Sequence, residues 1–306
     1  MNGYAISTRN LVKRYGHRHA LDAITLEVLQ GSITGLVGAN GAGKTTWMMT
    51  VAGFIMPDSG EIDILGQGPF NAALHGGKLG ILPQDSDLPS EATPYSILYR
   101  FARIQGLSPA AAKQNAVRLL EAVNMGDRAQ SPIRSLSHGM RKRVMVAQCF
   151  IGSPAVVLLD EPLNGLDPVE AARLKAFILS RKGLQTIVIS SHNLNDIETL
   201  CTHVAFMEKG RTVKTESIGK LTQGKGRVNY TLSAQPADLT TLQGILPGAE
   251  FSWQAKEMTL VCSFDEGMYT VESVNRVLLP ELLKTADISK VTPGVSLEKV
   301  FLSERS

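Results

Sequence analysis

The chain has 306 residues, of which 43% are hydrophobic and 19% are charged. This length suggests about two domains, and the apolar content is sufficient for buried cores. The formal net charge is only +3, so composition does not indicate nucleic acid as a partner.

The cysteines and the apolar segments restrict the class of protein further. Cys149, Cys201 and Cys262 are far apart and form no CxxC pair, which argues against disulfides and structural zinc. The N-terminus lacks the order of a signal peptide, and no stretch approaches the ~20 apolar residues of a membrane helix. We therefore expect a cytoplasmic chain that needs a partner chain for any role at a membrane.

In residues 4–66 the sequence pattern predicts short strands at 4–7, 24–29, 32–37 and 61–65, separated by Gly, Asn and Asp turns. A glycine-rich stretch follows the third strand and consists of Gly38, Ala39, Asn40, Gly41, Ala42, Gly43, Lys44, Thr45 and Thr46. A strand, such a loop and a helix start form the context of a phosphate-binding loop. Lys44 could reach the β- and γ-phosphates of a nucleotide, and the Thr45 hydroxyl could ligate Mg²⁺. The alternative is a glycine-rich turn without a ligand.

The next segment changes from glycine-rich to helical. Residues 66–77 are expected to form a loop, and residues 78–83 a short strand that ends at a proline. In 94–105, helical periodicity places four apolar residues on one face, namely Ile97, Leu98, Phe101 and Ile104. Ser108 is a plausible N-cap with Pro109 at the first helical position. We interpret this block as a small all-helical insertion.

A helix over 137–151 precedes five apolar residues at 155–159. Its cations at 141–143 are expected to form a solvated face, and the apolar run suits a parallel strand buried on both faces. Asp160 and Glu161 end that strand. Asp160 could hold Mg²⁺ beside Thr45, and Glu161 could orient or deprotonate the water that attacks the γ-phosphate. The alternative is an acidic strand end in a turn.

Two more helices, at 169–181 and 194–201, alternate with a strand at 185–190, so we expect βαβ units and a parallel sheet. After Gly210 the composition changes, and residues 219–226 are expected to be a linker. Beyond it we predict a strand at 227–233, a helix at 237–246, a strand pair at 250–264, a helix at 267–284 and a strand at 286–291. This βαββαβ order is ferredoxin-like in outline.

Over residues 1 to about 215 the motifs, in order, resemble those of ABC-type ATPases, the nucleotide-binding subunits of membrane transporters. Residues 136–141, Leu-Ser-His-Gly-Met-Arg, resemble the family signature, and residues 164–168, Asn-Gly-Leu-Asp-Pro, resemble its D-loop. Gln84 matches the Q-loop glutamine, His192 the switch histidine, and Tyr15 the aromatic that stacks on adenine. The signature departs from the usual double glycine, because His138 takes its first position and Met140 stands where glutamine is common.

The resemblance implies an α/β fold of the P-loop NTPase type. It would have a mixed or parallel sheet core, an antiparallel β subdomain and a helical subdomain at about 85–153. The ATPase domain would span 1–218, and a small α+β domain would span 227–306.

The resemblance also implies roles for single residues. Catalysis would fall to Glu161, His192 and Lys44, and Mg²⁺ would be bound by Thr45, Gln84 and Asp160. ATP contacts are expected from Tyr15, Gly38, Ala39, Asn40, Gly41, Ala42, Gly43, Lys44, Thr45, Thr46, Gln84, Ser137, Gly139 and Asp167. Ser137 and Gly139 would act on ATP held by another subunit across a two-fold dimer. For His192, Gln84 and Tyr15 the alternative is an ordinary structural role.

The expected function is ATP binding and hydrolysis in an ABC transporter, with closure of an ATPase dimer driving a separate membrane-spanning permease. The dimer would pair two copies or this chain with a related one, at the inner face of the cell membrane. The C-terminal layout, ending with residues 296–301, resembles ATPases of bacterial exporters. The alternative is a soluble ABC-type ATPase in translation or DNA repair. A single phosphate loop, and no long heptad region between Lys44 and Ser137, count against it.

Overall fold

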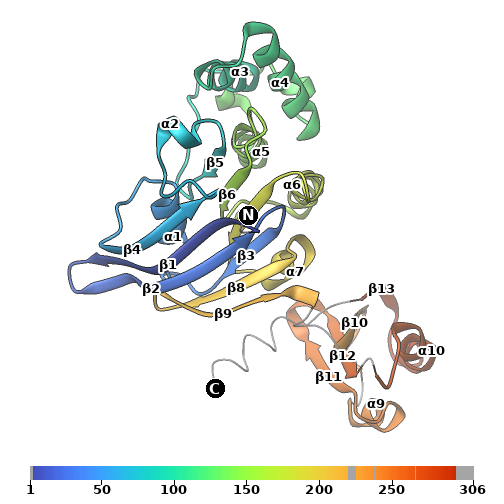
Figure 1. Cartoon of the computed structure of the whole chain (residues 1–306). Coiled ribbons are helices and arrows are strands. Elements are labelled where there is room, and N and C mark those ends of the chain that lie inside the picture. The colour runs from blue at the N-terminus through green and yellow to red at the C-terminus, as the bar shows by residue number, and fades with distance from the viewer. Residues whose placement is uncertain (1–2, 220–224, 237–238, 266, 294–306) are drawn as a thin grey trace. The chain divides into compact units, whose positions relative to one another are not determined.

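The computed structural model describes residues 3–219, 225–236, 239–265 and 267–293 (Figure 1). The chain divides into two compact units, residues 1–216 and 217–306, and each is described by itself below. Most of the expected linker at 219–226, and the whole segment 296–301, lie outside the described residues. No helix in the described part of the chain has both the length and the apolar character needed to cross a membrane.

The first unit contains an antiparallel sheet of three strands in the order β2-β1-β4. Its strands are β1 (Tyr4–Tyr15), β2 (Arg18–Leu29) and β4 (Ser59–Ile64). β1 and β2 are far longer than the predicted strands at 4–7 and 24–29. Asn10 and Ala23 adopt left-handed backbone conformations with φ of 48° and 54°, and the β1–β2 register shifts near both. Such irregularities break the period-two pattern by which strands are found in a sequence.

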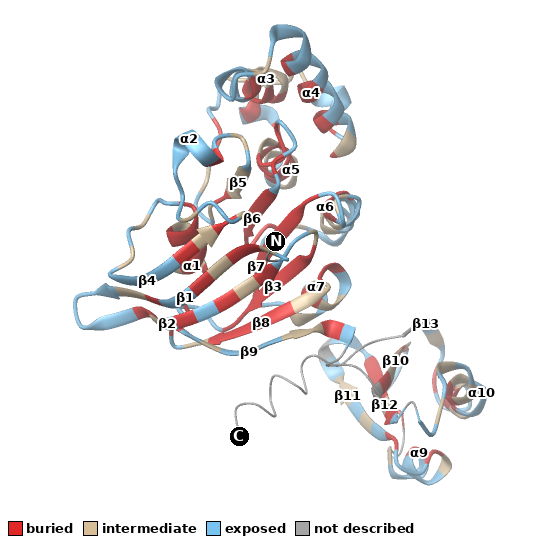
Figure 2. Cartoon of the chain, in the orientation of Figure 1, coloured by how far each residue is buried: buried red, intermediate tan, exposed pale blue. Residues whose placement is uncertain are grey.

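The second sheet of this unit has six strands in the order β5-β6-β7-β3-β8-β9. Their bounds are β3 (Ile33–Val37), β5 (Leu79–Leu82), β6 (Val156–Asp160), β7 (Thr186–Ser191), β8 (His203–Glu208) and β9 (Arg211–Ser217). All neighbours from β5 to β8 pair in parallel. Every residue of β6 is buried, which confirms the strand predicted from its apolar run (Figure 2). The carboxyl ends of β3, β6 and β7 meet at one edge, where ligands bind in such sheets.

The helices of the first unit are α1 (Lys44–Val51), α2 (Ala72–His75), α3 (Pro94–Ile104), α4 (Pro109–Ala122), α5 (His138–Gln148), α6 (Pro168–Leu179) and α7 (Leu194–Leu200). The Ser108 hydroxyl accepts a hydrogen bond from the backbone N–H of Ala111, which confirms the predicted N-cap. The short α2 lies within the segment that was expected to be a loop. Asn71 initiates it by accepting a hydrogen bond from the Ala73 N–H.

Burial on α3 and α5 differs from what the sequence pattern suggests. Ile97 and Leu98 are buried, whereas Phe101 and Ile104, on the same predicted face, are exposed. The prediction of a solvated face at 141–143 is wrong for two of its three cations, because Lys142 and Arg143 are buried. The reason is that α5 packs against α3, α4, α6 and β5, so little of its surface remains for solvent.

The second unit has the element order βαββαβ and an antiparallel sheet in the order β11-β12-β10-β13. Its elements are β10 (Lys225–Leu232), α9 (Leu239–Ile245), β11 (Glu250–Gln254), β12 (Thr259–Asp265), α10 (Val271–Leu282) and β13 (Ile288–Pro293). A separate core includes Tyr230 of β10, Leu260 of β12 and Leu278 of α10. This unit is therefore a small α+β fold with its own hydrophobic core.

Candidate functional site

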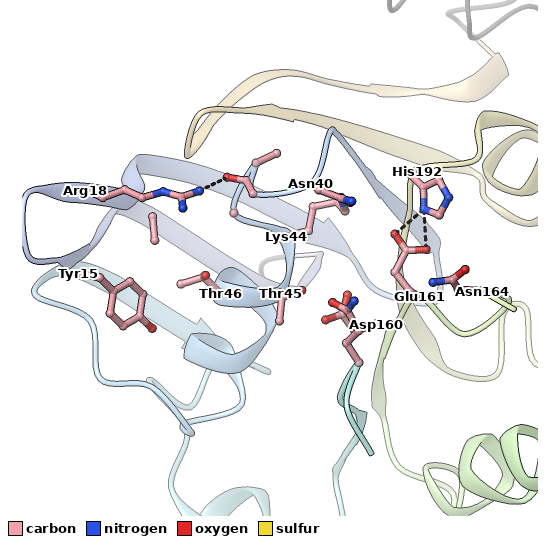
Figure 3. A pocket seen from close by; sticks show the side chains of 15 residues that line it. Tyr15, Arg18, Asn40, Lys44, Thr45, Thr46, Asp160, Glu161, Asn164 and His192 are labelled. Atoms are coloured by element: carbon pink, nitrogen blue, oxygen red, sulfur yellow. Dashed lines mark hydrogen bonds and ion pairs between the residues drawn. The ribbon is translucent and has the colours of Figure 1, made fainter. Parts of the chain in front are cut away.

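A cavity of about 670 Å³ opens at the edge where the parallel strands end. Figure 3 shows Tyr15 and Arg18 on one side of Lys44, with Glu161, Asn164 and His192 on the other. The cavity is lined by Tyr15, Arg18, Ala20, Asn40, Gly41, Ala42, Gly43, Lys44, Thr45, Thr46, Gln84, Asp160, Glu161, Asn164 and His192.

Most residues predicted for the site are therefore brought together. Five predicted contacts do not line this cavity, namely Gly38, Ala39, Ser137, Gly139 and Asp167. Gly38 has a backbone role, because a Cβ at this position would lie 2.3 Å from the Met207 carbonyl oxygen. Only glycine permits such a close approach.

The phosphate loop connects β3 to α1, and Lys44 is the first residue of the helix. The Lys44 ammonium donates to the carbonyl oxygens of Gly38, at 2.7 Å, and Ala39, at 3.3 Å. Gly41 and Gly43 have φ of 80° and 109°, values that side chains oppose. Burial lowers the pKa of Lys44, and the nearby carboxylates of Glu161 and Asp160 counteract this effect. The loop thus holds a cation beside a helix N-terminus, an arrangement suited to an anion.

Asp160 and Glu161 follow one another at the end of β6, and Ser190 of β7 holds both. The Ser190 hydroxyl donates to Asp160 Oδ1 and accepts a hydrogen bond of 2.8 Å from the Glu161 N–H. Asp160 Oδ2 is buried and has no hydrogen-bond partner in the described part of the chain. An unpaired buried carboxylate oxygen is costly, and this one is available to a cation.

Glu161 is the point at which the chain turns away from β6. Its backbone is left-handed, with φ of 47°, which is uncommon outside glycine and concentrates at functional sites. The Glu161 carboxylate oxygens lie 3.0 and 3.1 Å from Nδ1 of His192. The Glu161 side chain is nearly buried, whereas that of His192 is 57% exposed. The imidazole therefore holds the carboxylate from the open side of the cavity.

The residues of the cavity fit a magnesium ion that is bound both by protein oxygens and by a bound phosphate. Among the described residues, no group of three or more His, Cys, Asp or Glu side chains could hold a metal. Asp160, with its unpaired oxygen, and Thr45, with its hydroxyl, belong to one cavity. Because Mg²⁺ commonly takes one or two protein oxygens and completes its shell with phosphates and water, this donor set suits it.

Three lining residues, Arg18, Ala20 and Asn164, are missing from the site predicted by sequence. An Arg18 guanidinium nitrogen donates to the Gly41 carbonyl oxygen at 3.3 Å, across the phosphate loop. Asn164 lies three residues after Glu161, and its N–H donates to the Glu161 carbonyl oxygen at 3.3 Å. These three residues could have been found from their proximity in the sequence to predicted ones. Arg18 and Ala20 follow Tyr15 in one hairpin, and Asn164 is part of the D-loop-like segment.

Ser137 and Asp167 occupy helix N-termini outside the cavity. The Ser137 hydroxyl accepts a hydrogen bond from the Met140 N–H at 3.2 Å, so it caps α5. The Asp167 carboxylate caps α6 by accepting from the N–H groups of Val169 and Glu170. Gly139 lies against the Glu170 side chain. These residues gather on the neighbouring faces of α5 and α6 rather than around Lys44.

Comparison with known proteins identifies the family to which the chain is similar. A family model described as ABC transporter matches residues 21–164. The chain is 35% identical over 269 residues to the Nod factor export ATP-binding protein I of Ralstonia nicotianae, which covers 84% of this chain and 80% of that protein. It is 28% identical over 302 residues to the daunorubicin resistance ATP-binding protein DrrA3 of Streptomyces coeruleorubidus, which covers 97% of this chain and 95% of that protein.

The fold has counterparts among solved structures. The structure of cbiO1 from Clostridium perfringens, described as part of the ABC transporter complex cbiONQ, matches with a TM-score of 0.64 and 26% identity. The match covers 72% of this chain and 91% of that chain. The α/β fold with a phosphate loop, predicted from the sequence, is confirmed by this likeness and by the sheets described above.

Proposed function

The chain belongs to the ABC transporter family, and from this premise we propose that it is the ATPase subunit of an exporter that works as a dimer. ATP binding and hydrolysis are the activity of the family, and a transporter ATPase subunit implies a membrane-spanning permease as its partner. The export direction is supported by relatives named for Nod factor export and daunorubicin resistance. The relatives described above give no support to a role in translation or DNA repair.

The observation that carries this proposal is the convergence of Lys44, Asp160 and Glu161 on one cavity. The loop N–H groups and Lys44 would bind the phosphates of ATP, with Lys44 exchanging the Gly38 and Ala39 carbonyls for phosphate oxygens. Tyr15, at the rim and 52% exposed, would stack on the adenine. The ligand chemistry is therefore a nucleoside triphosphate held from both ends.

Thr45, Asp160 and Gln84 would hold Mg²⁺ beside the phosphates. When bound, Mg²⁺ neutralises charge that develops on the transferred phosphoryl group. The support is the unpaired Oδ2 of Asp160 and the position of Thr45 and Gln84 on the same cavity. Ser190 fixes Asp160 through its other oxygen, so the free oxygen has a defined direction.

Glu161 would act as the base or orienting group for hydrolysis. Its carboxylate would accept a proton from water while the water oxygen forms a bond to the γ-phosphorus and the bond to the ADP oxygen breaks. The contact from His192 Nδ1 would orient that carboxylate. The exposed remainder of the imidazole would face the γ-phosphate.

The second half of the site would come from another subunit. Ser137, Gly139 and Asp167 do not line the cavity of their own chain, although Ser137 opens a helix N-terminus suited to a phosphate. Two copies, or this chain and a related one, would therefore close around two ATP molecules. Through the permease, the dimer would lie at the inner face of the cell membrane.

The test compares two substitutions in the full-length chain. Glu161→Gln should bind ATP with unchanged affinity, lose turnover and accumulate as an ATP-bound dimer in size-exclusion chromatography with light scattering. Lys44→Ala should bind ATP more weakly in a fluorescent-nucleotide titration, because the buried cation is removed from the phosphate site. Glu61→Gln, at an exposed position of β4, is the control and should behave as the wild type. Normal turnover in Glu161→Gln would remove Glu161 from the role assigned to it.

A further inference from the structure

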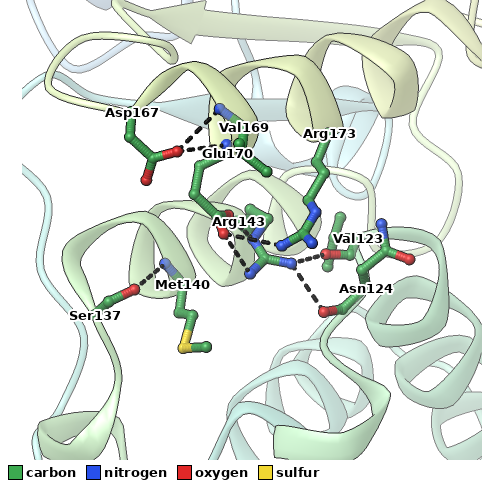
Figure 4. Close-up of polar contacts among 9 residues, drawn as sticks. All are labelled: Val123, Asn124, Ser137, Met140, Arg143, Asp167, Val169, Glu170 and Arg173. Carbon is green, nitrogen blue, oxygen red and sulfur yellow. Dashed lines mark hydrogen bonds and ion pairs between the residues drawn. The ribbon is translucent and has the colours of Figure 1, made fainter.

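Arg143, in the middle of α5, connects three helices through one buried guanidinium (Figure 4). Its Nη1 donates to the carbonyl oxygens of Val123, at 2.7 Å, and Asn124, at 2.8 Å, where α4 ends. Its Nε lies 2.6 Å from Oε2 of Glu170 on α6. Arg143 therefore links the helical subdomain to the helix that follows the D-loop-like segment.

Burial makes this link sensitive to the loss of either partner. Arg143 is only 2% exposed, and the Glu170 side chain 13%. Burial lowers the pKa of Arg143 and the Glu170 carboxylate opposes that shift, while an arginine remains charged in proteins. Removing one member of such a pair leaves a buried charge without its partner, which costs far more than breaking a surface ion pair.

Glu170 also lies between Gly139 and Asp167, two of the three residues that are proposed to act on a second subunit. A Cβ added to Gly139 would lie 3.0 Å from Cγ of Glu170, so glycine lets α5 approach this side chain. The Glu170 N–H is bound by the Asp167 carboxylate at 3.0 Å. Glu170 therefore contacts the starts of both α5 and α6, and this one residue sets the spacing between them.

We propose that the Arg143–Glu170 pair holds the Ser137 end of α5 and the Asp167 end of α6 as one unit, so that both reach the ATP of the second subunit together. This inference rests on the proposed dimeric function. Neither Arg143 nor Glu170 lines the cavity, so both are positioning residues. The pair acts on hydrolysis through geometry and leaves the phosphate loop of its own chain unaltered.

The first measurement is the distance between α4 and α6. Lys113→Cys on α4 and Ala176→Cys on α6 place spin labels at exposed positions, and the native cysteines are buried and free. Double electron–electron resonance should give a broader distance distribution in Glu170→Gln than in the wild type. Arg173→Gln is the matched control and should keep the wild-type width. Arg173 contacts the same carboxylate at 3.1 Å, but its side chain is 48% exposed. An unchanged width in Glu170→Gln would overturn the inference.

The second measurement separates positioning from a loss of fold. With the concentrated full-length chain, kcat for ATP should fall about tenfold in Glu170→Gln, equivalent to ~1.4 kcal/mol. The Kd for a fluorescent ATP analogue should stay at its wild-type value, because no residue of the cavity is altered. A merely structural effect would lower binding and turnover together, in proportion to the folded fraction, and would count against the inference.

A conservative variant keeps the test decisive if Glu170→Gln does not fold. Glu170→Asp retains the charge and shortens the side chain by one methylene, so it should show intermediate values of distance width and kcat. If Glu170→Gln is unfolded and Glu170→Asp has the wild-type distance width and kcat, the inference is overturned. If the wild-type chain fails to bind ATP, the proposed function fails, whereas the distance measurement still decides whether the pair holds α6 against α5 and the end of α4 that Arg143 binds.

Discussion

At the scale of single residues, the positions of Asp160 and Glu161 depend on a serine that sequence patterns did not identify. Ser190 is fully buried and contacts Asp160 through its proton and Glu161 through its oxygen. Ser190 fixes the direction of the Asp160 carboxylate and the strained backbone of Glu161. A serine at the end of an apolar strand carries no special signal, because its partners are thirty and twenty-nine residues away in the chain.

Ser190→Ala is therefore expected to impair turnover without disturbing the phosphate loop. Loss of a hydrogen bond to a charged group, worth roughly 1.5–3 kcal/mol, should lower kcat by at least about tenfold. The concentration of Mg²⁺ needed for half-maximal activity should rise, because Asp160 becomes free to rotate. ATPase assays at varied Mg²⁺ measure both effects. Ser190→Thr keeps the hydroxyl and should retain most activity; equal losses in both variants would contradict this role.

Arg18 offers a second prediction at this scale. Its guanidinium bridges the phosphate loop at Gly41 and lines the cavity, so it adds positive charge near the phosphates. Arg18→Gln should raise the Kd for ATP by about three- to tenfold, because one exposed charge contact is worth roughly 1 kcal/mol. Isothermal titration calorimetry at low and high salt should show that the difference in Kd between Arg18→Gln and the wild type narrows as salt ions screen the charge.

Arg14→Gln is the matched control for Arg18. Arg14 is exposed on the same hairpin, and it does not line the cavity. Its variant should therefore bind ATP with wild-type affinity. Equal weakening in both variants would attribute the effect to the net charge of the hairpin rather than to a contact in the site.

At the scale of elements, the strands and helices that could be predicted are those whose local pattern and tertiary surroundings agree. β6 is buried on both faces, as its unbroken apolar run indicates, and α4 begins at the Ser108 cap. The helix α5 could not be interpreted in this way. Lys142 and Arg143 are buried because of the elements packed around α5, and no local pattern records which helices will surround a cation.

The contact between β5 and α5 gives a prediction for stability. A Cβ added to Gly80 of β5 would lie only 1.9 Å from the backbone carbonyl oxygen of Cys149. Because backbone cannot move aside as a side chain can, Gly80→Ala should lower the free energy of unfolding by about 1–3 kcal/mol or more. Urea unfolding followed by circular dichroism measures the change.

Gly126→Ala provides the comparison for Gly80. The nearest atom to a Cβ there is the Cγ of Glu121 at 3.9 Å, which is ordinary van der Waals contact. This substitution should change the stability little. A Gly80→Ala protein as stable as Gly126→Ala would mean that β5 does not approach α5 as closely as described.

At the scale of the whole molecule, the site combines segments that only the fold brings together. The motif residues that line the cavity extend from Tyr15 to His192, and the resemblance of their motifs allowed most of them to be named from sequence. The partners that hold them, such as Ser190 for Asp160 and Glu170 for Arg143, could not be named. Their contacts arise from the pairing of β6 with β7 and the packing of α5 on α6, which are tertiary properties.

The division into two units predicts how ATP affects unfolding. The two hydrophobic cores share no residue, and every cavity residue belongs to the first unit. Differential scanning calorimetry of the full-length chain should therefore show two transitions. ATP with Mg²⁺ at a hundred times its Kd should stabilise only the first, by about 2.7 kcal/mol, because a ligand stabilises the fold that binds it. The Lys44→Ala protein should show a smaller shift at the same ATP concentration. An equal ATP-dependent shift of both transitions would show that the second unit responds to the nucleotide site.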